Sequence, residues 1–236
     1  MGYLLLEGGA EFGGEMAAAD RRALDLAGGD EAPVDIVPAA AAPDGNHERA
    51  GRRGVMWFQG LGARKVVSRP LIDEASARRP EIADALCRSR LVYLLGGFPA
   101  HLAASLLDTP CQDSMLSVVK TGGVVGGSSA GAMVLCDTFY DPKTDRLRKG
   151  LGLLSGAVII PHHDTYGSRW VGRLRDMLPD VLLLGIDEET GLINDAPGGG
   201  WTVYGKGGAT LHGRSQRRCY AAGKRIPGDK LQMPVG

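Results

Sequence analysis

Short apolar runs alternate with amphipathic helical patterns along most of the chain. The first apolar run is YLLL at 3–6, and the segment 16–26 then repeats its apolar residues at helical spacing. The same patterns predict further strands at 34–37, 65–67, 91–95, 157–160 and 181–186, with another ending at 124–125, and helices at 46–60, 80–87, 100–107 and 170–178. Strands separated by helices predict a largely parallel sheet that is covered by helices.

The pattern changes after Asp137. Residues 141–145 read as a polar loop, and 191–222 read as antiparallel strands interrupted by two glycine clusters. No linker, repeat or low-complexity tract divides the chain, so we expect one domain over residues 1–236, with the tail after Gly223 left unassigned. The predicted fold class is α/β, a mostly parallel sheet flanked by helices with a C-terminal antiparallel extension.

Composition narrows the classes of function. The chain has 236 residues, 44% of them hydrophobic, and its 27 cationic and 27 anionic side chains give a net charge of zero. A neutral chain has no field that attracts nucleic acid or an anionic membrane, so we expect neither partner. The first apolar run is too short for a signal peptide or a membrane span.

The cysteines indicate a reducing compartment. They lie far apart and without metal-ligand spacing, at Cys87, Cys111, Cys136 and Cys219. We therefore expect free buried thiols, no metal, and a cytoplasmic protein.

The segment Gly127-Ser128-Ser129-Ala130-Gly131 carries the strongest chemical signal. It follows the apolar run that ends at 124–125 and precedes the apolar residues 133–135, so the unit reads as strand, tight turn and helix. Such a turn strains the central residue and exposes the Ser129 hydroxyl at a helix N-terminus, where the Ala130 N–H faces a developing oxyanion. A glycine-rich loop that only caps a helix is the alternative, and the strand and helix on either side favour the nucleophile.

A serine nucleophile needs a base and a carboxylate that orients it. His162 follows the strand 157–160, and the carboxyl ends of parallel strands share one edge, so we predict that His162 is the base. We expect its neighbour His163 to face solvent or to support the site. For the acid we favour Asp141, with Asp145 and Asp164 as alternatives, and we expect a second oxyanion donor from residues 95–98.

Several further segments occur in a characteristic order. They are Gly8-Gly9-Ala10-Glu11, Gly96-Gly97, the turn at Ser129 extended to Ala132, Gly150 to Leu154, Pro161-His162, Gly185 to Thr190 and Val203 to Ala209. Together they resemble the dipeptidase E/cyanophycinase family of serine peptidases over most of the chain.

The resemblance implies a fold like that of class I glutamine amidotransferases, with serine where those enzymes carry cysteine. It implies Ser129 as nucleophile, His162 as base, and the N–H groups of Gly97 and Ala130 as oxyanion donors, without a metal or other cofactor. It also places Arg169, Arg173 and Glu188 as candidate substrate-binding residues. Dimers are common in the family, so a homodimer is expected.

The substrate expected from the resemblance is a short peptide. The family cuts short peptides or cyanophycin, often beside Asp or an isoaspartyl link. Phe98-Pro99 replaces an acidic or amide residue followed by Gln in cyanophycinases, and Ile160-Pro161 replaces Asp-Gln, which favours short peptides over cyanophycin. The sequence therefore predicts a serine peptidase for Asp- or isoAsp-linked dipeptides. The alternatives are a non-catalytic binding protein on the same fold and a hydrolase of a non-peptide amide or ester.

Overall fold

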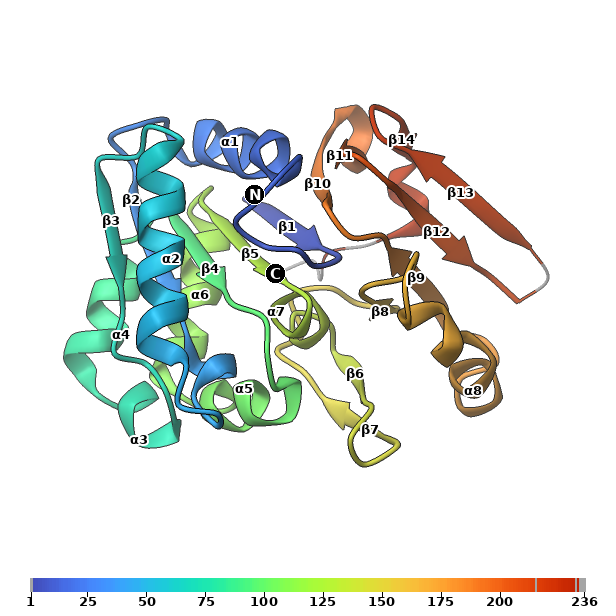
Figure 1. Cartoon of the computed structure of the whole chain (residues 1–236), viewed down its shortest axis with the longest axis horizontal. Coiled ribbons are helices and arrows are strands. Elements are labelled where there is room, and N and C mark those ends of the chain that lie inside the picture. Colours follow the sequence, from blue (N-terminus) through green and yellow to red (C-terminus); the bar gives the residue numbers. More distant parts are fainter. Residues whose placement is uncertain (1, 215, 232, 234–236) are drawn as a thin grey trace.

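The main sheet has eight strands with helices on both faces (Figure 1), in a computed structural model that describes residues 2–214, 216–231 and 233. Its order is β14-β11-β10-β1-β5-β4-β2-β3. The strands are β1 (Tyr3–Glu7), β2 (Pro33–Val37), β3 (Lys65–Ser68), β4 (Leu91–Leu94), β5 (Val124–Ser128), β10 (Thr190–Ala196), β11 (Gly200–Gly205) and β14 (Arg225–Ile226). Strands β1 to β5 are mutually parallel and the last three are antiparallel, which confirms the predicted fold class.

Alternating side chains of the central strand divide the core between the two faces of this sheet. Leu5 packs with α1 (Met16–Ala27) and α2 (His47–Gly60), while Leu4 and Leu6 pack on the opposite face. The helices α3 (Glu74–Ala77), α4 (Pro80–Cys87), α5 (Pro99–Leu106), α6 (Pro110–Lys120) and α7 (Ala130–Val134) contribute to that second cluster. Strands β1, β2, β4 and β5 are buried on both faces because helices cover both, whereas the edge strand β3 is partly exposed.

A separate four-stranded sheet carries the strands expected at 157–160 and 181–186. Its order is β13-β12-β9-β8, formed by β8 (Ala157–Ile160), β9 (Leu182–Ile186), β12 (Gly208–His212) and β13 (Arg217–Ala221). The expectation that Ser129 and His162 follow strands of one sheet is therefore wrong. Val158 and Ile160 pack instead with Leu174 of α8 (Trp170–Met177), in a small core of their own.

Two segments differ from the sequence prediction. The polar segment 141–145 is the tip of a hairpin, β6 (Thr138–Asp141) and β7 (Arg146–Lys149), rather than an irregular loop. Helix α6 was not predicted, although Thr109 caps its N-terminus and Pro110 opens it. Beyond Gly223, β14 pairs with β11, and positions 232 and 234–236 lie outside the described residues.

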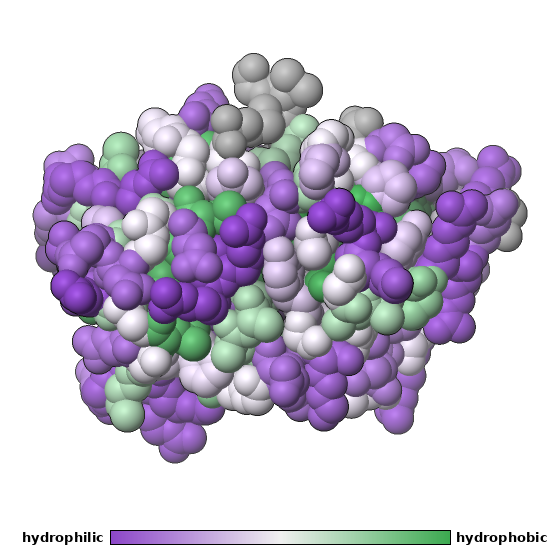
Figure 2. Space-filling model, turned by 90° about the horizontal axis from the view of Figure 1, so that it is seen from above, coloured by the Kyte–Doolittle hydropathy of each residue, from purple (hydrophilic) through white to green (hydrophobic). Residues whose placement is uncertain are grey.

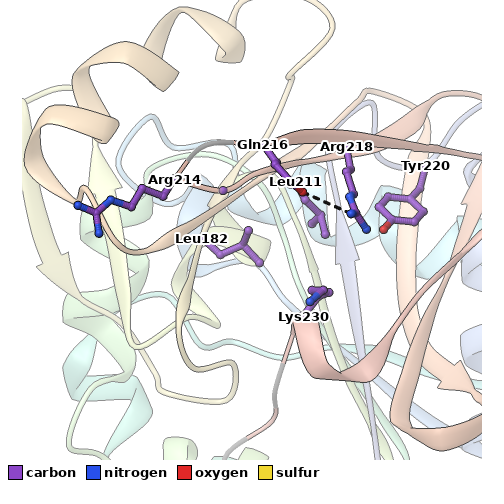
Figure 3. A pocket seen from close by; sticks show the side chains of 8 residues that line it. Leu182, Leu211, Arg214, Gln216, Arg218, Tyr220 and Lys230 are labelled. Atoms are coloured by element: carbon purple, nitrogen blue, oxygen red, sulfur yellow. Dashed lines mark hydrogen bonds between the residues drawn. The ribbon is translucent and has the colours of Figure 1, made fainter.

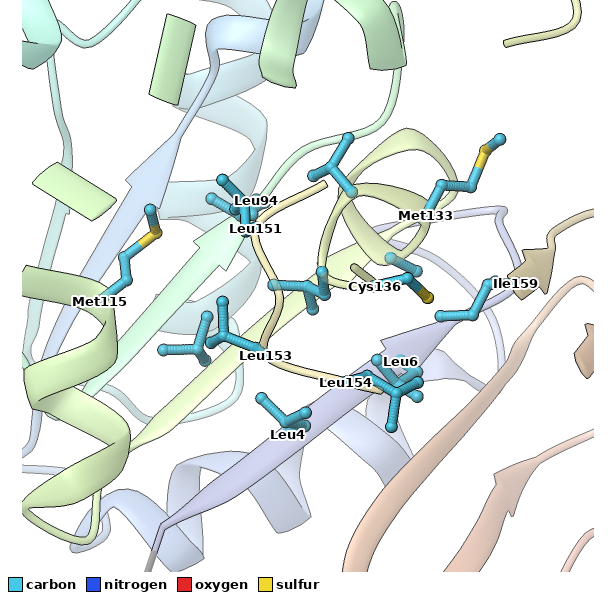
Figure 4. Packing of buried hydrophobic residues seen from close by; sticks show 14 of the residues in the cluster. Leu4, Leu6, Leu94, Met115, Met133, Cys136, Leu151, Leu153, Leu154 and Ile159 are labelled. Carbon is cyan, nitrogen blue, oxygen red and sulfur yellow. The ribbon is translucent and has the colours of Figure 1, made fainter. Parts of the chain in front are cut away.

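Buried side chains pack around the helix that follows the turn at Ser129. Met133 and Cys136 belong to one buried cluster with Leu94, Leu151 and Ile159, which come from β4, the segment after β7, and β8 (Figure 4). All five are at most 3% exposed. The helix that follows Ser129 is therefore fixed between the two sheets.

The outer surface is largely hydrophilic in the view of Figure 2, with apolar patches that are small and separate. Among the described residues, no helix combines the length and apolar character needed to cross a membrane. None of the four cysteines forms a disulfide in the described chain. Burial raises the pKa of Cys111 to about 11 and of Cys136 to about 12, but Cys87 and Cys219 are exposed, so the expectation of four buried thiols is wrong for two of them.

Candidate active site

The backbone at Ser129 has the strained conformation that the motif predicts. Its φ of 49° and ψ of −110° lie where a residue with a side chain is disfavoured. A Cβ on Gly127 would lie 2.6 Å from the carbonyl carbon of Gly131, and one on Gly131 would overlap the Leu94 carbonyl. The two glycines therefore let strand β5 and helix α7 meet closely enough to form the turn.

Three parallel strands end beside Ser129. Ser128 is in register with Glu7 of β1, and Gly127 is in register with Leu94 of β4. The Ser129 N–H donates to the Glu7 carbonyl at 3.0 Å. The loops after β1, β4 and β5 thus meet at the carboxyl edge of the main sheet, where ligand sites form in open α/β sheets.

His162 reaches Ser129 from the second sheet. Its Nε2 lies 2.8 Å from Ser129 Oγ, and its main-chain N–H donates to the Gly8 carbonyl at 2.8 Å. A Cβ on Gly9 would overlap the imidazole, so Gly9 gives the ring its space. Tyr166 stacks on the imidazole, with ring centroids 4.8 Å apart and an interplanar angle of 21°. These contacts hold the imidazole in one orientation.

The carboxylate beside His162 is Glu188. Its Oε1 lies 2.9 Å from His162 Nδ1, and the two side chains are 35% and 16% exposed. Strand β8 precedes His162 and the adjacent parallel strand β9 precedes Glu188, so the same carboxyl edge presents both. With a proton on Nδ1, His162 donates to Glu188 and its Nε2 accepts from the Ser129 hydroxyl.

Asp141, the carboxylate expected to orient the base, has other partners. It accepts hydrogen bonds from Thr144 Oγ1 at 2.7 Å and Arg148 Nε at 2.8 Å, within its own hairpin. Burial alone would raise its pKa, but the bonds from Thr144 and Arg148 lower it overall. The choice of Asp141 is corrected to Glu188, because adjacent parallel strands bring Glu188 to the imidazole while the β6–β7 turn holds Asp141 away from it.

The two alternative aspartates also have other partners. Asp145 pairs with Arg173 at 2.8 Å and accepts from the Tyr140 hydroxyl. Asp164 accepts the main-chain N–H of Glu188 at 2.9 Å, so it fixes the loop that carries Glu188.

Two main-chain N–H groups point to an oxyanion site near Ser129. In the described chain, the N–H groups of Gly97 and Ala130 have no hydrogen-bond partner, whereas Gly96 donates to Glu11 and Phe98 donates to the Ala40 carbonyl. An unpartnered N–H beside a serine hydroxyl can stabilise the negative oxygen of a tetrahedral intermediate.

A hollow of about 490 Å³ opens over Ser129. It is lined by Gly9, Ala10, Glu11, Arg53, Gly96, Gly97, Ser128, Ser129, His162 and Tyr166. Neither Arg53 nor Tyr166 belongs to a recognisable motif in the sequence, and Glu11 belongs only to the Gly8-Gly9-Ala10-Glu11 segment. Tyr166 lies only four residues after His162, so its place near the imidazole could have been predicted from the sequence. No sequence pattern around Arg53 connects helix α2 to the site.

The two arginines expected at the substrate lie elsewhere. Arg173 is half-exposed and pairs with Asp145, and Arg169 is exposed, and neither lines the hollow over Ser129. His163, expected in solvent or in support of the site, is buried and contacts Asp187 at 3.3 Å and His212 at 3.0 Å. Burial of the imidazole is the largest of the causes that lower the pKa of His212 to about 4.

Two other hollows lie on the described part of the surface. One of about 460 Å³ lies across Gly97, between Phe98 and the β6–β7 turn, and its lining includes Pro43, Pro99 and Pro142. The other, of about 270 Å³, lies on the second sheet among Leu211, Arg218 and Tyr220 (Figure 3) and includes no residue of the candidate site. Within the residues that the structure describes, no group of three or more His, Cys, Asp or Glu side chains is arranged to hold a metal ion.

Comparisons with known proteins point to one peptidase family. The model of peptidase family S51 matches residues 4–194. The cyanophycinase of Synechococcus elongatus is 30% identical over 199 residues, which are 78% of this chain and 60% of that protein, so the chain spans less than two thirds of that relative. The cyanophycinase of Trichormus variabilis is 28% identical over 225 residues, covering 88% of this chain and 72% of that protein.

A solved structure is similar over nearly the whole chain. It is a peptidase from an acI-B1 Actinobacterium, with 25% sequence identity, a TM-score of 0.84, and coverage of 96% of this chain and 97% of that chain. The predicted family and enzyme class are both confirmed: the chain belongs to peptidase family S51, whose members are serine-type peptidases.

Proposed function

We propose that this protein hydrolyses short peptides through an acyl-enzyme on Ser129, with His162 as general base and Glu188 as the carboxylate that orients it. The observation that carries the proposal is the continuous chain from Ser129 Oγ through both imidazole nitrogens to Glu188 Oε1, with separations of 2.8 and 2.9 Å. Such a chain, at a strained turn beside unpartnered N–H groups, is the arrangement that acyl transfer requires.

The reaction follows from the positions of these groups. Ser129 Oγ attacks the peptide carbonyl while His162 Nε2 takes its proton, and the negative oxygen is bound by the Gly97 and Ala130 N–H groups. The carbon–nitrogen bond then breaks as His162 returns the proton to the leaving amine, which leaves an ester on Ser129. Water attacks that ester, His162 takes and returns the second proton, and the free acid leaves.

The proposed substrates are dipeptides with an aspartyl or isoaspartyl residue on the acyl side. Arg53 supports this choice because it lines the hollow and makes no ion pair within the described chain, whereas its neighbour Arg52 pairs with Glu48. A guanidinium in a cleft binds a carboxylate in a bidentate arrangement. Arg53 thus replaces Arg169 and Arg173 as the proposed partner of the substrate carboxylate.

The test compares the purified protein with its Ser129→Ala variant on α-aspartyl, β-aspartyl and unrelated dipeptides, with amine release as the readout. We expect turnover of aspartyl substrates by the unchanged protein and none by Ser129→Ala, while Ser168→Ala, which removes an exposed hydroxyl, stays active. Turnover that survives in Ser129→Ala would refute the mechanism. Failure of a serine-reactive phosphonate to label Ser129 would instead favour a non-catalytic binding protein.

A further inference from the structure

The hollow of about 460 Å³, called the Phe98 hollow below, meets the hollow over Ser129 at Gly97. Gly97 is the one lining residue that the two hollows share. Its N–H has no hydrogen-bond partner in the described chain and is the proposed oxyanion donor, so a carbonyl oxygen bound there lies where the hollows meet. A peptide held by that oxygen can place the residues on the two sides of its scissile bond in different hollows.

The walls of the Phe98 hollow are mostly apolar. They include the ring of Phe98 and the proline rings at Pro43, Pro99 and Pro142. Phe98 is 37% exposed, as few large hydrophobic side chains of the described chain are. Ligand sites of this size are lined mainly by such apolar and aromatic groups. The hollow therefore offers apolar surface that the fold leaves uncovered.

The polar side chains of the lining offer little to a polar ligand. His101 Nε2 lies 2.7 Å from the carbonyl oxygen of Ile72, and the Asp141 carboxylate is bonded within its own hairpin. Lys143 is exposed. A polar group that leaves water without finding a partner costs free energy, so this lining favours an apolar side chain.

The backbone of Phe98 is held in place on both sides. Its N–H donates to the Ala40 carbonyl at 2.9 Å, and its carbonyl accepts the Leu102 N–H at 3.0 Å. Pro99 follows as the first residue of helix α5. The aromatic wall is thus formed before a ligand arrives, which lowers the cost of ordering on binding.

We propose that the Phe98 hollow binds the side chain of the residue on the leaving side of the scissile bond, and that it selects apolar side chains there. The inference rests on the proposed function, because it assigns the leaving side of the same cleft. Arg53, the proposed partner of the acyl-side carboxylate, lines the hollow over Ser129, so the Phe98 hollow remains for the leaving residue. Aspartyl-leucine and aspartyl-phenylalanine are therefore the favoured aspartyl dipeptides.

Phe98 also follows Gly97 in the chain, so support of the oxyanion donor must be separated from binding. A side chain that only supports Gly97 affects every substrate by the same factor. A side chain that contacts the leaving residue affects aspartyl-leucine more than aspartyl-glycine, which has no side chain on the leaving side. The ratio of the two kcat/KM values therefore reports on contact alone.

The kinetic experiment measures kcat and KM on aspartyl-leucine, aspartyl-glycine and leucyl-glycine for the unchanged protein, Phe98→Ala and the control Met56→Ala. Full burial of a leucine side chain corresponds to a factor of ~10–150 in affinity. We expect the lower end in an open hollow, a ~10-fold preference for aspartyl-leucine over aspartyl-glycine. Phe98→Ala should lower that ratio at least ~threefold, mainly through KM, because part of the apolar wall is lost. Met56 is exposed and lines neither hollow, so Met56→Ala should keep the ratio.

Two kinetic outcomes would overturn the inference. An equal fall on aspartyl-leucine and aspartyl-glycine in Phe98→Ala would leave Phe98 with a structural role only. Faster turnover of leucyl-glycine than of aspartyl-leucine by the unchanged protein would place the Phe98 hollow on the acyl side.

A binding experiment tests the same inference without catalysis. In a Ser129→Ala background, calorimetry compares aspartyl-leucine with aspartyl-glycine, with and without Phe98→Ala. We expect tighter binding of aspartyl-leucine with a more negative heat-capacity change, and loss of both differences in Phe98→Ala. Equal affinities in the Ser129→Ala protein would overturn the subsite. Absence of turnover by the unchanged protein, with the Phe98-dependent preference retained in binding, would overturn the proposed peptidase activity and keep the subsite.

Discussion

The replacement Glu188→Gln is the most direct test of the proposed triad. Glutamine keeps the size of the side chain, and its amide oxygen can still accept from His162 Nδ1 at the position of Oε1. The replacement removes the negative charge that faces the imidazolium formed when Ser129 loses its proton. The loss of activity therefore reports on that charge, while the fold is left in place.

The expected loss follows from the geometry of the pair. Opposite charges about 4 Å apart attract by about 4 kcal/mol at an effective dielectric constant near 20, and by about 1 kcal/mol in water. Glu188 is 35% exposed and His162 is 16% exposed, which places the pair between these limits and nearer the first. A loss of about 2–4 kcal/mol corresponds to a fall of about 30- to 1000-fold in kcat/KM.

The assay is kcat/KM on an aspartyl dipeptide for the unchanged protein, Glu188→Gln and the matched control Asp141→Asn. Asp141 is bonded to Thr144 and Arg148, so its replacement should change kcat/KM by less than about threefold, the range of an interaction remote from the reacting groups. Circular dichroism and urea unfolding verify that both variants are folded. Activity of Glu188→Gln close to that of the unchanged protein would refute Glu188 as the acid, and a large loss in folded Asp141→Asn would restore the original prediction.

Three further outcomes are expected. Gly9→Ala should abolish peptide turnover while the protein stays folded, because the added methyl group takes the space of the His162 ring. A variant with the turnover and the phosphonate labelling of the unchanged protein would contradict this. Arg53→Gln should reduce kcat/KM on an aspartyl dipeptide by at least ~10-fold, the effect of one hydrogen bond between charged groups, with Arg52→Gln on the same helix as the control. Burial is the main cause that raises the pKa of Asp20 from 3.8 to about 7, so the folded protein keeps a proton that the unfolded chain releases. The free energy of unfolding should therefore fall as pH rises from about 4 to about 7, and urea titrations of Asp20→Asn should show a smaller fall over the same window.

Features that depend on local backbone geometry could be predicted from the sequence. Ser129 lies in a motif whose glycines are required by close approaches of the backbone, and His162 lies two residues after an apolar strand. The glycines of such a motif are needed for the turn itself, so the turn can be predicted from the sequence before the fold is known. The assignment of strands to the two sheets could not be predicted, because β8 and β9 have the same apolar pattern as strands of the main sheet.

Features that depend on contacts between distant segments could not be predicted. Asp141 was favoured because it lies between Ser129 and His162 along the chain, but order along the chain does not fix which carboxylate meets an imidazole. Glu188 meets it because β9 is the parallel neighbour of β8, and that pairing is a property of the second sheet. Arg53 reaches the hollow from helix α2 and has no sequence pattern that relates it to the site. The possible homodimer stays a prediction, since it needs a measurement of mass in solution.

The division of the site between two sheets explains the role of the loop after β1. The nucleophile belongs to the main sheet, while the base and the acid follow strands of the second sheet, so their alignment depends on how the sheets are joined. Two main-chain hydrogen bonds make that junction at Gly8 and Gly9: His162 donates to Gly8 at 2.8 Å, and Glu189 donates to Gly9 at 3.3 Å. The glycine pair that reads in the sequence as a simple turn thus connects the loops of the base and the acid to the strand beside Ser129. A separation of 2.8 Å between Ser129 and His162 depends on this junction, because reacting groups that shift by about 1 Å lose much of their rate.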